Sequence, residues 1–254
     1  RKLTILQLYP RDMNIYGDSG NTLVLEQRAK WHGYETKIIS YDPGDKLPKD
    51  VDIIIGGGGQ DSGQDKIQAD LLSIGSPLRD MAQAGMPMLV ICGLYQLFGK
   101  FFRTQDGHII HGIGLLDLET HAGHERLIGN IITQSAEFGD IIGYENHSGQ
   151  TFLGPRVKPL GTVQKGAGNN GQDDTEGARY KNVIGSYLHG SLLPKNPAIA
   201  DFLIEQAATR KFGDFTPTVI DDRFATLARK HAQARPREFR SWYAESMKRL
   251  LLFD

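Results

Sequence analysis

One cysteine occupies a position from which it can act as a nucleophile. Residues 86–99 read MPMLVICGLYQLFG, and Cys92 is the only cysteine in the chain of 254 residues. A nucleophile at a sharp strand-to-helix turn projects from the sheet edge, and the backbone N–H groups that follow it face the reacting carbonyl. A helix N-terminus also favours the thiolate form. Gly93 is the small neighbour that such a turn needs, so we predict a nucleophilic Cys92, with a buried core cysteine as the alternative.

Two other stretches carry groups that a nucleophilic thiol requires. In IIIGGGGQD (53–61), four glycines follow an apolar run. Their backbone N–H groups can approach a ligand and complete an oxyanion hole. The pattern fits neither a dinucleotide-binding loop nor a P-loop, and a flexible turn stays open as an alternative. GSYLHG (185–190) contains His189, and histidine is the base expected for a cysteine that is distant in sequence. A histidine at the end of a strand is usually structural, so His189 is a candidate only because the same chain also has Cys92 and the glycine loop.

The elements that must position these groups follow from the hydrophobic pattern. The predicted strands of the first half are 3–9, 36–41, 51–59 and 86–92. The predicted helices are 21–34 and about 64–84, the second with a break near Gly75. One side of the first helix is expected to carry Leu23, Val24, Gln27 and Trp31. A short helix is expected after the cysteine, with Leu94, Leu97 and Phe98 facing inward. Strands that alternate with helices at this spacing predict a parallel, doubly wound sheet.

The second half of the chain is richer in strand patterns. Short β-branched segments are expected at 107–118, 126–134, 141–145 and 181–190, with a polar turn at 165–179. A helix is expected at 196–212, and the tail from 214 to 254 has two helical patterns separated near Pro236. The sequence thus predicts an α/β protein with a mostly parallel sheet, flanking helices and a β-rich second half.

Composition excludes several classes of partner. The formal net charge of −1 gives no basic field for nucleic acid. No apolar run approaches the roughly 20 residues that span a bilayer, so we expect no direct membrane insertion. A lone cysteine forms no internal disulfide, which favours a cytoplasmic location.

Metal-dependent hydrolysis is a competing chemistry. His108 and His111, and again His121 and His124, form close pairs. Neither pair has the HExxH pattern, and no second cysteine is present. We therefore expect no metal site and no cofactor, and no convincing ATP-binding motif is found.

Five stretches together resemble class I glutamine amidotransferases of the CobB/CobQ-like branch. They are NIYGDSGN (14–21), GGGGQD (56–61), ICGLYQLFG (91–99), YENHSGQTFLG (144–154) and GSYLHG (185–190). The resemblance covers roughly residues 3 to 212. It implies a class I glutamine amidotransferase-like fold for 1–213, and leaves 214–254 as a helical C-terminal extension. Within this branch, the chain is similar to the glutaminase subunits of lipid II isoglutaminyl synthases.

The resemblance implies roles for the nucleophile and its surroundings. Cys92 would attack the side-chain amide carbon of L-glutamine, and His189 would act as the base and then protonate the departing ammonia. The resulting thioester would be hydrolysed to glutamate. The oxyanion would be held by N–H groups of two pairs of candidates, Gly93 or Leu94 and Gly57 or Gly58.

The resemblance also implies a set of glutamine-binding residues. Arg126 matches the family's substrate-contacting arginine, and a guanidinium fork suits the α-carboxylate of glutamine. A surface salt bridge is the alternative for this residue. Gln96, Asn146 and His147 would line the same cleft, although Asn146 and His147 equally fit the bracing of a turn.

The same resemblance implies a partner. The ammonia would pass to a Mur-ligase-like ATP-dependent synthetase subunit in a heterodimer, which amidates D-glutamate in the lipid II stem peptide during peptidoglycan synthesis. Many class I enzymes carry an acid two residues after the histidine, where this chain has Ser191, so we expect the partner to donate the orienting acid. The partner would also give a role to the tail residues Trp242, Tyr243, Leu250 and Leu251, unless the tail packs on its own domain.

Two further interpretations stay open. The chain could be the glutaminase half of another CobB/CobQ-type amidating synthase, such as cobyric acid synthase. It could also be a scaffold of this fold that binds a partner without catalysis.

Overall fold

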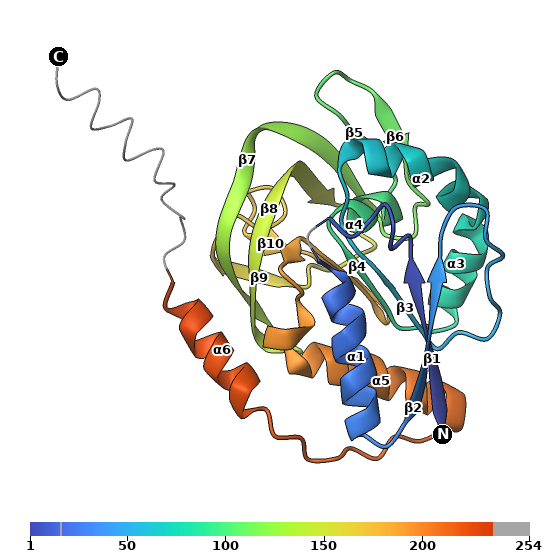
Figure 1. Cartoon of the computed structure of the whole chain (residues 1–254). Helices are drawn as coiled ribbons and strands as arrows, with labels where there is room; N and C mark the ends of the chain where they lie inside the picture. The colour runs from blue at the N-terminus through green and yellow to red at the C-terminus, as the bar shows by residue number, and fades with distance from the viewer. Residues whose placement is uncertain (16, 236–254) are drawn as a thin grey trace.

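Two sheets form the body of the protein, in a computed structural model that describes residues 1–15 and 17–235 (Figure 1). The first sheet has six strands in the order β11-β12-β4-β3-β1-β2, and only the β11–β12 pair is antiparallel. The strands are β1 (Lys2–Leu8), β2 (Glu35–Tyr41), β3 (Ile53–Gly56), β4 (Met88–Ile91), β11 (Ala178–Tyr180) and β12 (Val183–Ser186). The predicted parallel sheet is therefore present.

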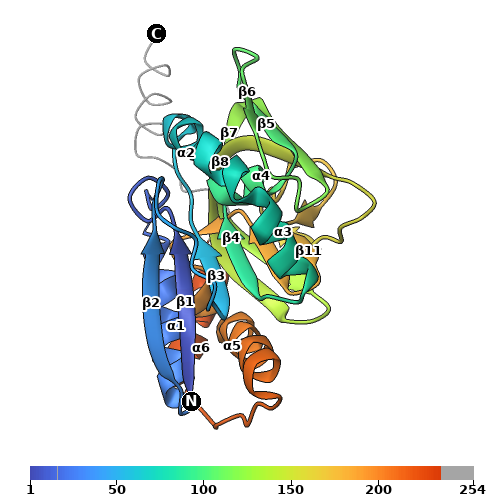
Figure 2. The same cartoon turned by 90° about the vertical axis from the view of Figure 1, so that its right-hand side faces the viewer.

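Helices cover both faces of this sheet, which explains why its central strands are almost wholly apolar. Every residue of β3, β4 and β12 is buried, as expected for strands covered on two sides. Helices α1 (Ser19–Trp31) and α5 (Pro197–Phe212) lie on one face, and α2 (Asp61–Ser73) and α3 (Gly75–Gln83) lie on the other (Figures 1 and 2). The predicted break near Gly75 is found, between α2 and α3.

The predicted face of the first helix is wrong. Leu23 and Trp31 are 62% and 50% exposed, whereas the side of α1 that packs inward includes Arg28. The Arg28 guanidinium forms ion pairs of 2.6 Å with Asp201 of α5 and with Asp222. The buried side of α1 thus carries Leu25 and Ala29 together with an arginine that has two carboxylate partners.

The second sheet is mostly antiparallel and is dominated by a long hairpin. The strands are β5 (Phe101–Arg103), β6 (Ile109–His111), β7 (Leu118–Ser135), β8 (Gly139–Leu153), β9 (Gly161–Lys165), β10 (Thr175–Glu176) and β13 (Leu188–His189). The order is β10-β9-β7-β5-β6, and β8 pairs with β7 and β13. The expected short segments are wrong in length, because β7 and β8 have 18 and 15 residues. Polar residues alternate with buried residues along both strands, so the sequence pattern suggests several short strands where the structure has one continuous strand.

The segment predicted as one strand at 181–190 is divided between the two sheets. Strand β12 ends at Ser186, and β13 pairs with β8, where His189 faces Tyr144. Buried Glu176 fixes this junction, because its Oε1 accepts hydrogen bonds from the Tyr187 N–H at 2.9 Å and the Ser186 hydroxyl at 3.0 Å. The junction carries His189 out of the parallel sheet and toward the nucleophile.

The C-terminal part of the described chain is an appended helix. After α5, Gly213 adopts φ 83, and α6 (Arg223–Gln233) follows. Helix α6 is held by Arg229, which donates to the carbonyls of Lys195, in the 3₁₀ helix η1 (Leu193–Lys195), and of Asp140. Within 1–15 and 17–235, no helix has both the length and the apolar character needed to cross a bilayer. The second helical pattern of the tail, with Trp242, Tyr243, Leu250 and Leu251, lies outside the described residues.

Candidate active site

Cys92 forms a strained elbow between β4 and the short helix α4 (Gly93–Phe98). Its φ of 50° and ψ of −105° are sparsely populated for a residue with a side chain. The Cys92 N–H donates to the Ser186 carbonyl at 2.9 Å, and the Cys92 carbonyl accepts from the Gln96 N–H at 2.9 Å. Every residue of α4 is buried, including the predicted inward face. The surrounding core therefore holds the cysteine in the conformation expected of a nucleophile elbow.

The glycine loop, the cysteine and the histidine converge at one point. A Cβ added to Gly58 would lie 2.9 Å from Cys92 Cβ, 3.3 Å from Cys92 Sγ and 3.0 Å from His189 Cε1. These distances show that a side chain at Gly58 would enter the space between the thiol and the imidazole. Three stretches that are distant in the sequence thus meet where the sequence analysis placed the reaction.

An acid from the N-terminal loop stands beside the histidine. Asp18 Oδ1 lies 3.8 Å from His189 Nδ1, and both side chains are 2% exposed. Burial opposes the protonated imidazole, but the neighbouring Cys92 and Asp18 outweigh burial and raise the pKa of His189 to about 10. A protonated imidazole beside a thiol is the arrangement that stabilises a thiolate.

Asp18 had no predicted role, although it lies within NIYGDSGN (14–21). A signal was available in the order of the strands. Asp18 follows β1, and the glycine loop follows β3, which is the neighbour of β1 in the sheet. Loops after the carboxyl ends of neighbouring parallel strands meet at the same edge.

Two of the four candidate oxyanion donors are engaged within the protein. The Gly58 N–H donates to Asp18 Oδ2 at 2.8 Å, and the Leu94 N–H donates to the Gly57 carbonyl at 3.3 Å. Gly93 opens α4, and the first N–H groups of a helix have no acceptor within it. The nitrogen of Gly59 lies 3.1 Å from the position of a Cβ on Gly93. Gly93 and Gly57 thus stay candidate donors, and Gly59, which the sequence prediction did not include, lies close enough to Gly93 to be a further candidate.

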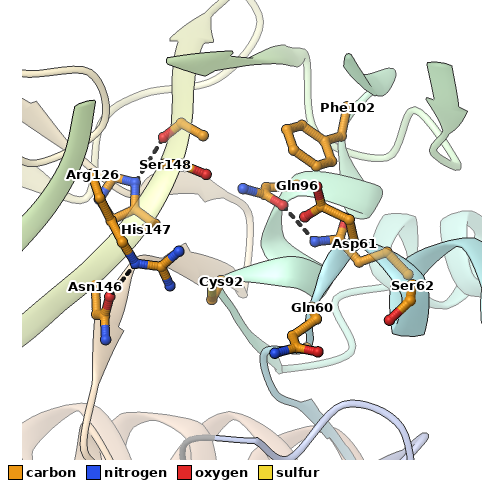
Figure 3. Close-up of a pocket in the computed structure, with 13 residues that line it drawn as sticks. Gln60, Asp61, Ser62, Cys92, Gln96, Phe102, Arg126, Asn146, His147 and Ser148 are labelled. Atoms are coloured by element: carbon orange, nitrogen blue, oxygen red, sulfur yellow. Dashed lines mark hydrogen bonds between the residues drawn. The ribbon is translucent and has the colours of Figure 1, made fainter. Parts of the chain in front are cut away.

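A cavity of about 350 Å³ opens beside the cysteine, a size typical of sites for small ligands. Its walls include five predicted residues, namely Cys92, Gln96, Arg126, Asn146 and His147. Figure 3 shows Arg126, Asn146 and His147 on one side of the cavity and Gln60, Asp61 and Ser62 on the other. The latter three had no predicted role, and they lie around the start of α2.

Arg126 lies on an irregular part of the long hairpin. The pairing of β7 with β8 changes register between Ala122 and Leu127, so the strand bulges where this arginine is found. Arg126 Nε donates to Asn146 Oδ1 at 2.6 Å. The amide thus orients the guanidinium, and the two residues form one side of the cavity (Figure 3).

His147 and Gln96 form fixed walls of the cavity. The His147 ring stacks on Tyr187 at 3.6 Å between centroids, and its Nδ1 lies 2.7 Å from the Gly149 carbonyl. Burial lowers the pKa of His147 to about 3, so the ring stays neutral at ordinary pH. Gln96 accepts from Gln64 at 2.9 Å and donates to the Tyr187 hydroxyl at 3.0 Å.

The histidines considered for metal binding make other contacts, although His108 and His124 line a second cavity that shares Arg126 with the first. His108 contacts Asp65 at 3.3 Å, and His121 contacts Glu119 at 3.4 Å. Among residues 1–15 and 17–235, no group of three His, Cys, Asp or Glu side chains is arranged to hold a metal ion. The metal-dependent alternative therefore lacks a ligand set in the described part of the chain.

Comparison with known proteins places residues 4–197 in a family. Residues 4–197 match the family model of the CobB/CobQ-like glutamine amidotransferase domain. The chain is 41% identical over 222 residues to the lipid II isoglutaminyl synthase (glutamine-hydrolyzing) subunit GatD of Staphylococcus aureus (strain N315), covering 87% of this chain and 90% of that protein. The corresponding GatD subunit of Streptococcus pneumoniae (strain ATCC BAA-255 / R6) is 37% identical over 215 residues, covering 84% and 83%.

Other relatives are more distant. A probable cobyric acid synthase of Methanothermobacter thermautotrophicus is 35% identical over 164 residues, covering 59% of this chain and 32% of that protein. The crystal structure of a glutamine amidotransferase from Thermotoga maritima superposes with a TM-score of 0.54 at 15% identity, covering 91% of this chain and 93% of that one. The latter similarity shows the fold alone, and the expected amidotransferase fold is confirmed.

Proposed function

The chain belongs to the CobB/CobQ-like glutamine amidotransferase family, and from this premise we propose that it is the glutamine-hydrolysing subunit of a lipid II isoglutaminyl synthase. The observation that carries the proposal is the convergence of Cys92, His189 and the glycine loop beside a cavity walled by Arg126. The chain is similar to two GatD subunits over most of their length, which supports lipid II isoglutaminyl synthase as the enzyme to which the subunit belongs. We take 1–213 as the amidotransferase unit and 214–254 as its extension.

The proposed reaction uses the groups of the elbow in turn. The Cys92 thiolate attacks the side-chain amide carbon of L-glutamine, and N–H groups of Gly93 and of the glycine loop stabilise the oxyanion that forms. The C–N bond breaks as the His189 imidazolium donates a proton to the nitrogen, which leaves as ammonia. The neutral imidazole then takes a proton from water, whose oxygen attacks the thioester. The C–S bond then breaks, which releases glutamate and restores the Cys92 thiolate beside the His189 imidazolium.

The Arg126 guanidinium binds the α-carboxylate of glutamine in this proposal. Arg126 and Cys92 line the same cavity, and charge-assisted hydrogen bonds from a guanidinium hold a carboxylate in a defined orientation. The orientation of the α-carboxylate determines whether the side-chain amide reaches the thiol, since misplacement by about 1 Å costs about 100-fold in rate.

The ammonia is used by a second subunit. A Mur-ligase-like, ATP-dependent partner in a heterodimer would attach it to D-glutamate of the lipid II stem peptide, in the cytoplasm, where a lone catalytic thiol stays reduced. The cobyric acid alternative has weaker support, because those relatives match only part of the chain and a third of their own length.

Ammonia release from L-glutamine tests the proposal. Wild type and Cys92→Ala are compared alone and with a co-purified ligase partner, and a thiol-reactive glutamine analogue reports labelling of Cys92 by mass spectrometry. We expect wild type to release ammonia and to be labelled, and the alanine variant to do neither. Equal release by both proteins, or no release and no labelling under any condition, contradicts the proposal and favours the non-catalytic scaffold.

A further inference from the structure

Asp61 and Arg126 are the two opposite charges of the cavity beside Cys92. Of the described residues that line this cavity, Asp61 is the one acid, and Arg126 is the one base that is charged at ordinary pH, because burial keeps His147 neutral. Figure 3 shows Asp61 and Arg126 on opposite sides of the cavity. A free amino acid is a zwitterion whose α-carboxylate and α-ammonium are attached to one carbon. The cavity therefore offers one complementary charge to each group of that zwitterion.

The Asp61 carboxylate is not committed to a partner within the fold. Asp61 begins α2, and within 1–15 and 17–235 its side chain makes no ion pair and no hydrogen bond to another residue. Partial burial raises the pKa of Asp61, and the Arg126 guanidinium acts against this rise. The charge of the arginine therefore reaches the aspartate, although the cavity lies between them. A role as an acid at the helix N-terminus is the alternative for this residue.

Gln64 adds a second acceptor on the same face of α2. It follows Asp61 by three residues, a spacing that makes side chains neighbours on a helix, and both residues line the cavity. Gln64 is 3% exposed, and its Nε2 donates to Gln96 Oε1 at 2.9 Å. Its Oε1 is buried and has no hydrogen-bond partner in the described part of the chain. A buried acceptor without a donor costs free energy, and an ammonium group has three N–H donors.

The two charges lie where the first cavity meets a second one. The second cavity, of about 670 Å³, shares Asp61 and Arg126 with the first, whereas Cys92 lines the first alone. In glutamine, methylene groups separate the α-carbon from the side-chain amide. A substrate whose α-carbon lies between Asp61 and Arg126 can therefore extend its amide toward the thiol.

We propose that Asp61 binds the α-ammonium of L-glutamine, with Gln64 Oε1 as a second acceptor, and that this contact makes the site specific for an α-amino acid. The inference rests on the proposed glutaminase function, in which Arg126 binds the α-carboxylate. Attachment at the ammonium, the carboxylate and the side-chain amide fixes the orientation of the substrate. A site built to bind a polar group rejects an analogue that lacks it, because the buried partner is then left unpaired.

Glutaramate, which is glutamine without its α-amino group, separates ammonium binding from a structural role. The KM for L-glutamine and the Ki of glutaramate as a competitor of glutamate formation are measured for the full chain in complex with the ligase partner. We expect Asp61→Asn to raise KM about tenfold, a modest effect because the carboxylate is partly exposed, with kcat within about threefold. The Ki of glutaramate should stay within about twofold of wild type, since that compound has no ammonium.

Gln64→Met keeps the length of the side chain and removes the acceptor. It should raise KM for L-glutamine about threefold, less than Asp61→Asn, because the lost acceptor is uncharged. It should also leave the Ki of glutaramate unchanged. An equal loss for both compounds would show that Gln64 acts only through Gln96, and would remove it from the inference.

Asp65→Asn is the matched control, since Asp65 is an acid of the same helix that contacts His108 at 3.3 Å and lines the second cavity but not the first. It should leave KM and kcat unchanged. Wild-type KM in Asp61→Asn would overturn the inference, and so would an equal weakening of L-glutamine and glutaramate, which is the result of a purely structural role. A wild type that releases no ammonia and is not labelled by the glutamine analogue counts instead against the proposed function.

Discussion

The buried part of the site, with Cys92 and His189, and the exposed part, with Arg126, are held in different ways. The parallel sheet fixes Cys92 through the backbone, with a hydrogen bond to the Ser186 carbonyl and a fully buried helix after it. The antiparallel sheet presents Arg126 from a register shift on an exposed part of β7. In the proposed mechanism, the groups that make and break bonds are therefore fixed by the core, whereas the group that recognises substrate extends from an irregular strand. Changes on the first side should affect kcat, and changes on the second should affect KM.

The largest loss of kcat is expected for substitution of His189. His189→Ala should lower kcat for ammonia release by 10³-fold or more, since it removes both the proton donor and the imidazolium beside the thiol. KM should change little, because His189 is not among the residues that wall the cavity. Steady-state ammonia release checks this prediction, and His231→Ala on the surface of α6 is the control. A rise in KM as large as the fall in kcat would contradict the division between a buried chemical part and an exposed recognition part.

A smaller effect is expected at the glycine loop. Gly58→Ala places a methyl group within 3.0 Å of His189 Cε1 and 2.9 Å of Cys92 Cβ, so the thiol and the imidazole must separate. We expect kcat to fall about 100-fold, in line with the cost of an approximately 1 Å misplacement. The melting temperature, measured beside the kinetics, should fall only slightly. Normal kcat would show that the core on this side yields more easily than its burial suggests.

The opposite side is tested at the arginine. Arg126→Ala should raise KM for glutamine by 10–100-fold, since hydrogen bonds to charged groups contribute about 1.5–3 kcal/mol. Arg126→Lys should recover only part of this loss, because an ammonium lacks the planar fork. Arg103→Ala, an exposed arginine of β5, is the control in the same kinetic assay. If kcat fell as far as in His189→Ala, recognition and chemistry would not be separable.

The junction between the two sheets can be tested through the pH dependence of the protein's stability. Burial raises the pKa of Glu176 to about 7, against the lowering effect of hydrogen bonds from Tyr187 and Ser186. The folded protein therefore binds this proton more tightly than the unfolded chain, whose value is near 4.5. The stability that this group contributes is fully present below pH 4.5 and is lost as the pH rises toward 7.

Glu176→Gln removes that titration. The free energy of unfolding of the variant minus that of wild type should increase by on the order of 2 kcal/mol from pH 4.5 to pH 8. Urea unfolding at the two pH values measures the change, and Glu137→Gln, at an exposed ion pair with Arg179, is the control. An equal difference from wild type at both pH values would contradict the assignment of a protonated Glu176.

The sequence predicted the elements whose signals are local. The strand, the cysteine, the glycine and the short helix that follow one another at 86–99 lie in a single contiguous stretch. Their order and apolar pattern therefore predicted the elbow without knowledge of the fold. The helix at 196–212 was predicted for the same reason.

What the sequence could not predict depends on neighbours that are distant along the chain. The buried face of α1 is decided by Arg28, whose partners Asp201 and Asp222 belong to the far end of the described chain. Asp18 meets His189 only because β1, β3, β4 and β12 lie next to one another in the sheet. Periodicity carries no information about either pairing.

The hydrogen bond between the Cys92 N–H and the Ser186 carbonyl has a consequence for synthesis on the ribosome. Ser186 and His189 are both translated long after Cys92. Strand β12 can pair with β4 only once the hairpin β11–β12 has left the exit tunnel, and such non-local pairing is late and slow. A nascent chain therefore carries its thiol without an imidazole beside it, and under the proposed mechanism the order of translation delays glutamine hydrolysis until the domain is nearly complete.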